Sequence, residues 1–439
     1  MDRYPDALET AGVPRFFWAR GIFLGWWVLG AVSLVSFSRV AFFNPILGVF
    51  VQPLEDEFGW SRATIAGALA LGTLVGAGLS PLIGPIVDRR GGRYFMVFGA
   101  ALGGVLLILL AAINEVWQFY LLFGAGRAMV TAILEIAIAV TIANWFIRGR
   151  GRATGLMLIG TRGGMALMPL VVLLFLSVSD WRAAFAALGV ISLLIAVLPP
   201  WLLVRRRPED LGLRPDGDGY LGGPASSAPS ASDPVWTARQ AVRTKAFWLL
   251  LLGTSQLFIV GGATNFLLAS HLEDNGISQT TAILVITVWA LVGLFGGLAG
   301  GEIRDRFPLR YALPAVLMMT SSAIVWLIFV DSVWMAYVFA IWHGIAFGIQ
   351  LPLNQISFPD YFGRWSIGAI RGITAPVQFG LNAGGPFVAG LVFDARQSYD
   401  LILAVFVGLL LLAAVLIFLS RPPPPPLSEA SSAYTRPPI

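Results

Sequence analysis

The sequence has no cysteine, a single lysine and two histidines among its 439 residues. Without cysteine the chain forms no disulfide and has no thiolate metal site. Charged residues make up 12% of the chain, against about 25% in ordinary soluble domains, while 57% of the residues are hydrophobic. A soluble protein of this length has too little interior to bury so much apolar surface. The composition therefore indicates an integral membrane protein.

Apolar runs of about 20 residues recur along the chain, and this is the length at which a helix crosses a hydrocarbon core. The pattern predicts an all-α polytopic membrane protein with twelve transmembrane helices in two six-helix repeats. The expected spans lie near residues 22–45, 62–87, 94–113, 117–146, 153–177, 183–204, 246–270, 279–303, 311–330, 333–357, 367–392 and 400–420.

These spans divide the chain into a cytoplasmic N-terminal segment, two six-helix bundles, a cytoplasmic linker and a Pro-rich cytoplasmic tail. Their expected bounds are 1–21 for the N-terminal segment, 22–204 and 246–420 for the bundles, 205–245 for the linker and 421–439 for the tail. The Gly-, Ala-, Ser- and Pro-rich stretch 222–234 is typical of disordered spacers. We expect Ser232 or Asp233 to cap a short surface helix, polyproline II structure at Pro422–Pro426, and no removed leader.

Arginine residues gather on one side of the predicted membrane. The connections after even-numbered spans carry most of them, whereas the opposite side has only Arg62, Arg182 and Arg396 near span ends. Positive residues are retained in the cytoplasm, so we expect both termini there and a plasma-membrane location, the bacterial inner membrane in particular. The net charge of +5 comes from positive residues on the cytoplasmic side of the predicted membrane, so it gives no indication of a nucleic-acid partner. We take a monomer in the lipid bilayer as the default.

A ten-residue string occurs twice, once in each hydrophobic half. Residues 84–93 are echoed by residues 301–310 at an offset of 217 residues, and the same offset pairs Gly155 with Gly372 and Pro169 with Pro386. Within the string it pairs Gly84 with Gly301, Asp88 with Asp305, Arg89 with Arg306, and Arg93 with Arg310. Duplication of a membrane unit is typical of transporters.

The twin Gly-x-x-x-Asp-Arg strings after spans 2 and 8 resemble the signature of the major facilitator superfamily. Three further stretches resemble its bacterial monocarboxylate-porter-like branch, which includes oxalate–formate antiporters: Gly25-Trp26-Trp27, Phe58-Gly59-Trp60-Ser61-Arg62 and Arg207-Pro208-Glu209-Asp210-Leu211-Gly212. The resemblance covers the chain except the linker and tail. It implies that spans 1, 2, 4 and 5 and their repeats 7, 8, 10 and 11 line a central cavity.

The repeated string suggests a conformational latch at the cytoplasmic surface. A carboxylate at a span end accepts hydrogen bonds from the N–H groups of a neighbouring helix start, and arginines clamp its remaining acceptors. Such a latch locks one packing of the halves and breaks in another. Its expected members are Gly84, Asp88, Arg89 and Arg93 with Gly301, Asp305, Arg306 and Arg310. The alternative is ordinary positive-inside charge with one paired aspartate.

Charged residues inside the predicted spans point to a binding site. Arg127 and Arg162 lie roughly ten residues into spans 4 and 5, near the midplane at about 1.5 Å per residue, and Arg39 lies about two-thirds along span 1. A lone arginine at such depth costs at least about 2.5–3.5 kcal/mol. Glu135 is the obvious counter-charge, so a positive surplus remains that attracts an anion, and a carboxylate fits the guanidinium fork. Alternatively Arg127 pairs with Glu135 while the other arginines reach backbone carbonyls.

The second half offers neutral groups at the matching positions. The 217-residue offset takes Arg39, Arg127 and Arg162 to Gln256, Gly344 and Phe379. The candidate polar contacts in this half are Gln256, Asn265, His343, Gln350, Asn354, Gln378 and Asn382. His343 has a side chain that titrates near neutrality, so it is a candidate for proton coupling as well as a candidate structural histidine.

The sequence departs from the branch it resembles. Monocarboxylate porters carry an arginine in span 8, where this chain has Gly297, so lactate- or oxalate-like specificity does not carry over. We expect a secondary carrier, with neither enzymatic activity, cofactor nor metal, that moves a small organic anion by alternating access, coupled to protons or to exchange. The alternatives are an exporter of amphipathic drugs or metabolites and a non-transporting membrane sensor.

The latch yields the first prediction. Replacing Asp88 by Asn removes the charge that the exposed N–H groups and arginines recognise, so substrate transport falls while expression is maintained. Transport by the variant in proteoliposomes, normalised to the amount of protein, measures the effect. Full transport by Asp88→Asn contradicts the latch.

Overall fold

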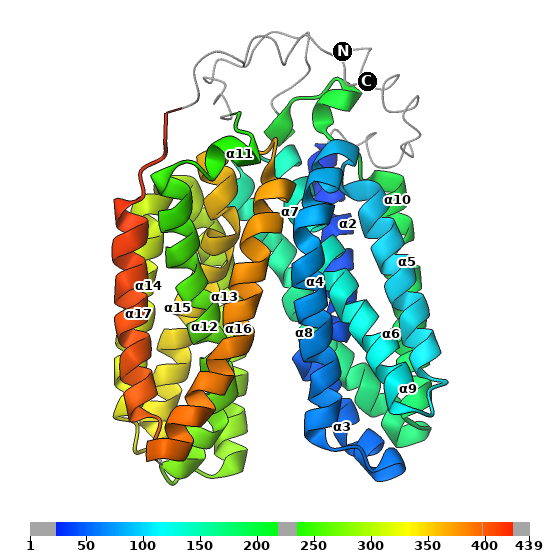
Figure 1. The fold of residues 1–439 in the computed structure, drawn as a ribbon, viewed down its shortest axis with the longest axis vertical. Coiled ribbons are helices and arrows are strands. Elements are labelled where there is room, and N and C mark those ends of the chain that lie inside the picture. The colour runs from blue at the N-terminus through cyan, green and yellow to red at the C-terminus, as the bar shows by residue number, and fades with distance from the viewer. Residues whose placement is uncertain (1–22, 218–234, 397, 425–439) are drawn as a thin grey trace. The chain divides into compact units, whose positions relative to one another are not determined.

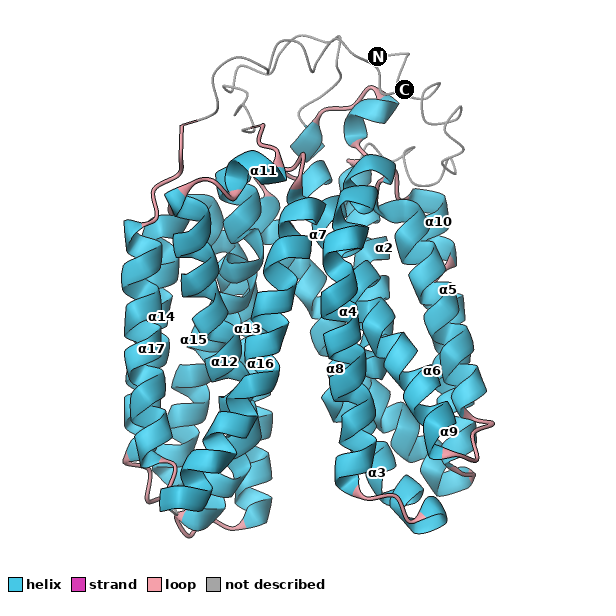
Figure 2. Cartoon of the chain, viewed as in Figure 1, coloured by secondary structure: helices cyan, strands magenta, loops and turns pink. Residues whose placement is uncertain are grey.

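The computed structural model describes residues 23–217, 235–396 and 398–424. Within these ranges the elements are helices joined by turns and short loops, with no β-strand (Figure 2). The chain forms two compact units: residues 1–229 with 371–383, and residues 230–370 with 384–439. We call these unit 1 and unit 2.

The described part of unit 1 begins with a broken first span and ends with two short turns of 3₁₀-helix (Figure 1). Its longer helices are α2 (Leu24–Ser38), α3 (Asn44–Phe58), α4 (Arg62–Arg90), α5 (Gly92–Leu110), α6 (Val116–Met129), α7 (Glu135–Trp145), α8 (Arg150–Val178), α9 (Trp181–Ala196) and α10 (Leu198–Leu203). The 3₁₀ turns are Pro208–Leu211 and Pro215–Gly217.

The described part of unit 2 contains one short helix and six long ones. They are α11 (Ala238–Ala241), α12 (Lys245–Asp274), α13 (Gln279–Arg306), α14 (Leu309–Ile328), α15 (Val333–Phe362), α16 (Ile367–Arg396) and α17 (Asp400–Leu419). Residues 371–383 of α16 group with unit 1.

Eleven helical stretches among the described residues are long and apolar enough to cross a membrane. The 30-residue α16 has the length of a twelfth span. The same helix pairs pack in both units: α4 against α6 and α5 against α9 in unit 1, α13 against α15 and α14 against α17 in unit 2. The predicted all-α fold with twelve spans in two six-helix repeats is confirmed.

Three spans of unit 1 depart from regular α-helix, and in span 6 Val197 separates α9 from α10. Span 1 changes to a 3₁₀ turn at Arg39–Phe42, and Phe43 is extended with φ −101° and ψ 160°. Pro45 follows, and because proline lacks an N–H and crowds the preceding turn, it starts a new helix and does not continue the old one. Span 4 contains a π-helical segment at Val130–Leu134, a form that is frequent at functional sites.

Glycines allow the helices of unit 1 to touch backbone to backbone. A Cβ on Gly160 of α8 would overlap the Ser33 carbonyl of α2, and one on Gly164 would lie 2.7 Å from the Phe37 carbonyl oxygen. In unit 2, a Cβ on Gly296 of α13 would lie 2.6 Å from the Ile345 carbonyl oxygen of α15. In lipid the hydrophobic effect does not drive helices together, so van der Waals packing at such close contacts holds neighbouring spans together.

The predicted linker begins with a segment that belongs to unit 1. Residues 205–217 are folded against unit 1, and Leu211 and Leu213 are buried. The short surface helix exists as α11, but its cap is Thr237, whose Oγ1 accepts a hydrogen bond from the Gln240 N–H at 3.3 Å. The expected caps Ser232 and Asp233, the stretch 222–234 and the tail beyond Pro424 lie outside the described residues.

A matched pair of glycines on α8 tests this packing. Gly160→Ala forces its methyl group into the Ser33 carbonyl, whereas a Cβ on Gly163 meets only the Phe37 ring at an ordinary 3.7 Å. We expect Gly160→Ala to lower the free energy of unfolding by about 1–3 kcal/mol, with little change for Gly163→Ala. Thermal unfolding in detergent measures both; equal midpoints contradict the packing argument.

Candidate functional site

Arg39 and Glu135 form an ion pair inside unit 1. A terminal nitrogen of Arg39 contacts a carboxylate oxygen of Glu135. The other terminal nitrogen, Nη2, donates to Thr161 Oγ1 at 3.4 Å. Arg39 is 5% exposed, and Glu135 lies directly after the π-helical segment. The pair thus joins the break in span 1 to the irregular part of span 4.

Span 1 extends further than we expected, and this changes the position of Arg39. The sequence placed Arg39 in the outer part of a span ending near residue 45, whereas the apolar helical stretch runs from Leu24 to Phe58. Arg39 therefore lies near the middle of the span, at its break. At this depth an unpaired charge is costly, which explains why both ends of its guanidinium have partners.

Arg127 is held in a different way. Its Nε donates to Thr73 Oγ1 of α4 at 2.9 Å, and its guanidinium carbon lies 4.9 Å from the centre of the Phe43 ring. Among the described residues no carboxylate oxygen lies within ion-pair distance of Arg127, so Glu135 pairs with Arg39 instead of Arg127. The side chain is half-buried, and its two terminal nitrogens have no partner in the described chain.

Phe43 connects the two arginines. Its ring centre lies 5.6 Å from the guanidinium carbon of Arg39 and 4.9 Å from that of Arg127. Phe43 has the extended backbone of the break in span 1. Aromatic faces attract guanidinium groups, so Phe43 holds two like charges beside one another.

Arg162 follows Thr161 on α8 and is half-buried. It has neither an ion pair nor a hydrogen bond within the described ranges. Thr161 contacts Arg39, so Arg162 lies one residue from the charged cluster. Because Glu135 is paired with Arg39, the charge of Arg127 leaves this part of unit 1 with an excess of positive charge.

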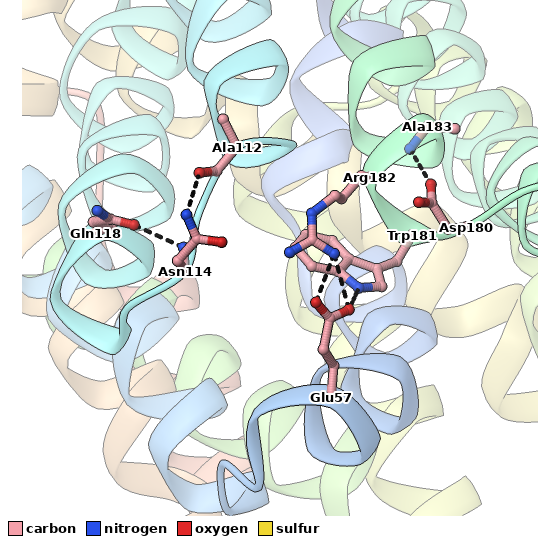
Figure 3. Close-up of polar contacts among 8 residues, drawn as sticks. All are labelled: Glu57, Ala112, Asn114, Gln118, Asp180, Trp181, Arg182 and Ala183. Carbon is pink, nitrogen blue, oxygen red and sulfur yellow. Dashed lines mark hydrogen bonds and ion pairs between the residues drawn. The ribbon is translucent and has the colours of Figure 1, made fainter.

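A second polar contact closes the end of unit 1 at which α3 ends and α9 begins (Figure 3). Glu57 accepts from the indole N–H of Trp181 at 2.5 Å and from Arg182 Nη1 at 2.9 Å. Asp180 caps α9 by accepting from the Ala183 N–H at 2.8 Å. Glu57 and Asp180 are exposed whereas Trp181 is buried, and the contacts of Glu57 tie the second half of span 1 to α9.

The neutral candidates of the second half lie in varied surroundings. Gln256 is half-buried on α12. Asn265 is exposed, and its Nδ2 donates to the Gly261 carbonyl of its own helix at 2.7 Å. Asn382 is exposed and lies in the stretch of α16 that groups with unit 1.

His343 lies in an aromatic stack of unit 2. Its ring centre is 5.0 Å from that of Phe339 and 5.8 Å from those of Phe347 and Trp289. The side chain is 2% exposed, and Nδ1 has no hydrogen-bond partner among the described residues. Packed among rings, His343 has the surroundings of a structural histidine.

The repeated string makes the same aromatic contact in both units. The Arg93 guanidinium lies 4.5 Å from the Trp201 ring and 5.8 Å from the Tyr94 ring. Arg310 lies 5.0 Å from the Phe418 ring and 5.5 Å from the Tyr311 ring. The offset of 217 residues pairs these aromatic partners as well. Each arginine therefore joins the third span of its unit to the sixth.

The other members of the string are distributed as follows. Gly84 and Gly301 are buried, Arg89 is exposed, and Asp88 and Asp305 are half-buried, each with interactions of its own. Arg306 pairs with Glu302 one turn earlier at 2.8 Å. Arg304 forms an ion pair with Asp360 of α15. The latch remains a proposal, and it now rests on the two aspartates, since Arg93 and Arg310 contact their own units.

Sequence reasoning missed four residues of this region: Phe43, Thr73, Thr161 and Arg371. Arg371 belongs to the part of α16 grouped with unit 1, and the charge of Glu135 acts on it. The Phe43-Asn44-Pro45 break was the available signal for Phe43, because proline interrupts a helix. A hydroxyl such as Thr73 or Thr161 carries no sequence signal of its own.

The chain belongs to the Major Facilitator Superfamily, whose family model matches residues 28–379 and 257–438. It is thus a multi-pass membrane protein of a transporter family. Two solved members have the same fold: the proton:xylose symporter XylE, with a TM-score of 0.70 at 15% identity over 90% of this chain and 96% of that one, and FucP, with 0.66 at 14% over 89% and 98%.

Curated relatives include the probable L-galactonate transporter of Escherichia coli, 24% identical over 63% of this chain and 61% of that protein. The membrane sensor protein UhpC of the same organism is 25% identical over 66% and 65%. The chain thus spans less than two thirds of the length of these relatives. Monocarboxylate transporter 2 of Mesocricetus auratus is 23% identical over 85% and 80%.

Two ion pairs of unit 1, Arg39–Glu135 and Arg182–Glu57, allow a matched test of burial. Glu135→Gln leaves the 4% exposed Arg39 side chain without a counter-charge, whereas the Arg182–Glu57 pair is 32% and 40% exposed. Breaking a buried pair costs on the order of 3 kcal/mol and an exposed one about 1 kcal/mol or less. Thermal unfolding should therefore show the larger loss for Glu135→Gln, and an equal loss for Glu57→Gln contradicts it.

Proposed function

We propose that the protein is a secondary carrier of a small organic carboxylate, and that Arg127 binds the carboxylate group. The carrier works by alternating access and draws its energy from a proton or exchange gradient. The observation that carries this proposal is the way the guanidinium group of Arg127 is held in unit 1.

The environment of Arg127 leaves its binding edge open. Thr73 takes up Nε, and the Phe43 ring lies against the guanidinium group. The two terminal nitrogens remain, and they present parallel N–H donors with the spacing of the two oxygens of a carboxylate. A group already fixed by two neighbours loses little side-chain freedom when a ligand binds.

Arg39 has a different role in this proposal. Both of its terminal nitrogens are occupied, one by Glu135 and the other by Thr161. The pair keeps one positive charge neutral beside the site, while Arg127 and Arg162 supply the excess that attracts an anion. Glu135, 32% exposed, is better placed than the enclosed His343 to exchange a proton, so we assign coupling to Glu135.

The names of the relatives support the substrate class. The L-galactonate and monocarboxylate transporters are named for organic acids. The excess charge also argues against a neutral amphipathic cargo, since an arginine pair at this depth is costly unless an anion neutralises it. We further propose the bacterial inner membrane as its location, with both termini in the cytoplasm.

The test is a binding screen on the purified protein in detergent, and its readout is the same whichever way the substrate crosses the membrane. Mono- and dicarboxylates are compared with their neutral amides by ligand-induced shifts in thermal unfolding. We expect a carboxylate to stabilise the protein and its amide to have no effect. Arg127→Gln should weaken that binding by about 10- to 100-fold, the value of a hydrogen-bonded charge.

Further variants sharpen the test. Arg127→Lys keeps the charge but loses the fork, so it should recover only part of the affinity. Arg162→Gln should weaken binding less, and Arg182→Gln, at the far end of unit 1, should leave it unchanged. Unaltered binding in both Arg127→Gln and Arg162→Gln, or stabilisation by amides equal to that by acids, overturns the proposal.

A further inference from the structure

We propose that unit 1 contains an anion-binding site made of backbone N–H groups at the turn between α7 and α8, and that the carboxylate of Asp216 occupies it. Asp216 lies in the segment Arg205–Gly217, which we call the strap. The strap is then an integral part of unit 1 that holds this turn in place.

Three consecutive residues of the turn donate to the one carboxylate. The Ile147 N–H reaches Oδ1 at 3.1 Å and Oδ2 at 3.0 Å. The Arg148 N–H donates to Oδ2 at 2.8 Å and the Gly149 N–H to Oδ1 at 3.0 Å. Successive N–H groups that converge in this way make an anion-binding concavity, and the start of the 29-residue α8 adds the positive end of its dipole.

Asp216 has an unusual backbone conformation where it makes this contact. It has φ 60° and ψ 3°, and it is the one non-glycine residue with positive φ in the described part of the chain. Residues with a Cβ seldom adopt this conformation. A carboxylate that accepts from three N–H groups is a physical reason for the chain to adopt it here.

Further contacts hold the strap to the end of α7. The Trp145 indole N–H donates to the Arg205 carbonyl at 3.1 Å, and Asn144 Nδ2 donates to the Arg206 carbonyl at 3.2 Å. A Cβ on Gly91, within the repeated string, would lie 2.8 Å from Arg206 Cβ. The strap therefore passes directly over the start of α5 and the end of α7.

The turn between α7 and α8 connects two helices that carry residues of the candidate site. It joins α7, which begins with Glu135, to α8, which carries Thr161 and Arg162. Fixing the turn fixes how these two helices follow one another. A spacer would leave them free at this end, and the strap removes that freedom.

Hydrogen exchange of the full-length protein in detergent tests the proposal without a transport substrate. The peptide containing residues 147–149 is followed in wild type, Asp216→Asn, Asp216→Gly and Asp210→Asn. Asp210 is exposed on the same strap, so its variant loses the same charge without touching the turn. Glycine keeps the positive φ but removes the carboxylate.

We expect both Asp216 variants to exchange at these amides about tenfold faster or more, because bonds to a charged acceptor are lost, while Asp210→Asn matches wild type. Wild-type protection in Asp216→Gly would show that the carboxylate does not hold the turn. Equal acceleration in Asp216→Asn and Asp210→Asn would show a general charge effect. Either result overturns the proposal, and neither bears on the carboxylate site at Arg127.

Discussion

A chain inside lipid must satisfy its own backbone hydrogen bonds, and this constraint governs the rest of the structure. Regular helix meets it at every residue, so a departure from regular helix needs support from surrounding protein. Unit 1 departs from it at Arg39–Phe43 in span 1, at Val130–Leu134 in span 4 and at Val197 in span 6. The first two departures adjoin the Arg39–Glu135 pair. The irregular backbone and the buried charges thus occur together because each requires the same shielded surroundings.

The duplicated architecture separates what the scaffold needs from what the site needs. Packing of the second span of each unit against the fourth, and the stacking of Arg93 and Arg310 on paired aromatic rings, recur in both units. Arg39, Arg127 and Arg162 have no charged counterparts at the matching positions. Features that repeat hold each bundle together. Features that occur once, such as the broken span and its ion pair, are not needed for the packing that both bundles share, so they can be specific to one ligand.

Hydrophobic periodicity and the repeated string were sufficient to predict the fold, because span length and duplication are written directly in the residue pattern. The arginines of the site were also visible, since a charge in a long apolar run stands out. The partner of Glu135 was not. The sequence offered Arg127 as the partner, because Arg39 was expected in the outer part of span 1. The break at Phe43 that brings Arg39 to Glu135 depends on how span 1 continues to Phe58. The strap was missed because its turn-forming composition is typical of exposed loops, whereas its burial depends on tertiary contacts with Trp145 and Ile147.

The two anion-directed features of unit 1 use the same chemistry at different places. At Arg127 a side chain fixed by Thr73 and Phe43 keeps two donors open, whereas at the α7–α8 turn three backbone donors are already filled by Asp216. The filled site does not depend on a ligand, so it is suited to holding structure. In the proposed function, the open site at Arg127 gains its partner when an anion binds, and the cost of its uncompensated charge favours that binding. The helix α7 links the Asp216 turn to the Arg39–Glu135 pair, because α7 begins with Glu135 and ends at the turn whose N–H groups donate to Asp216.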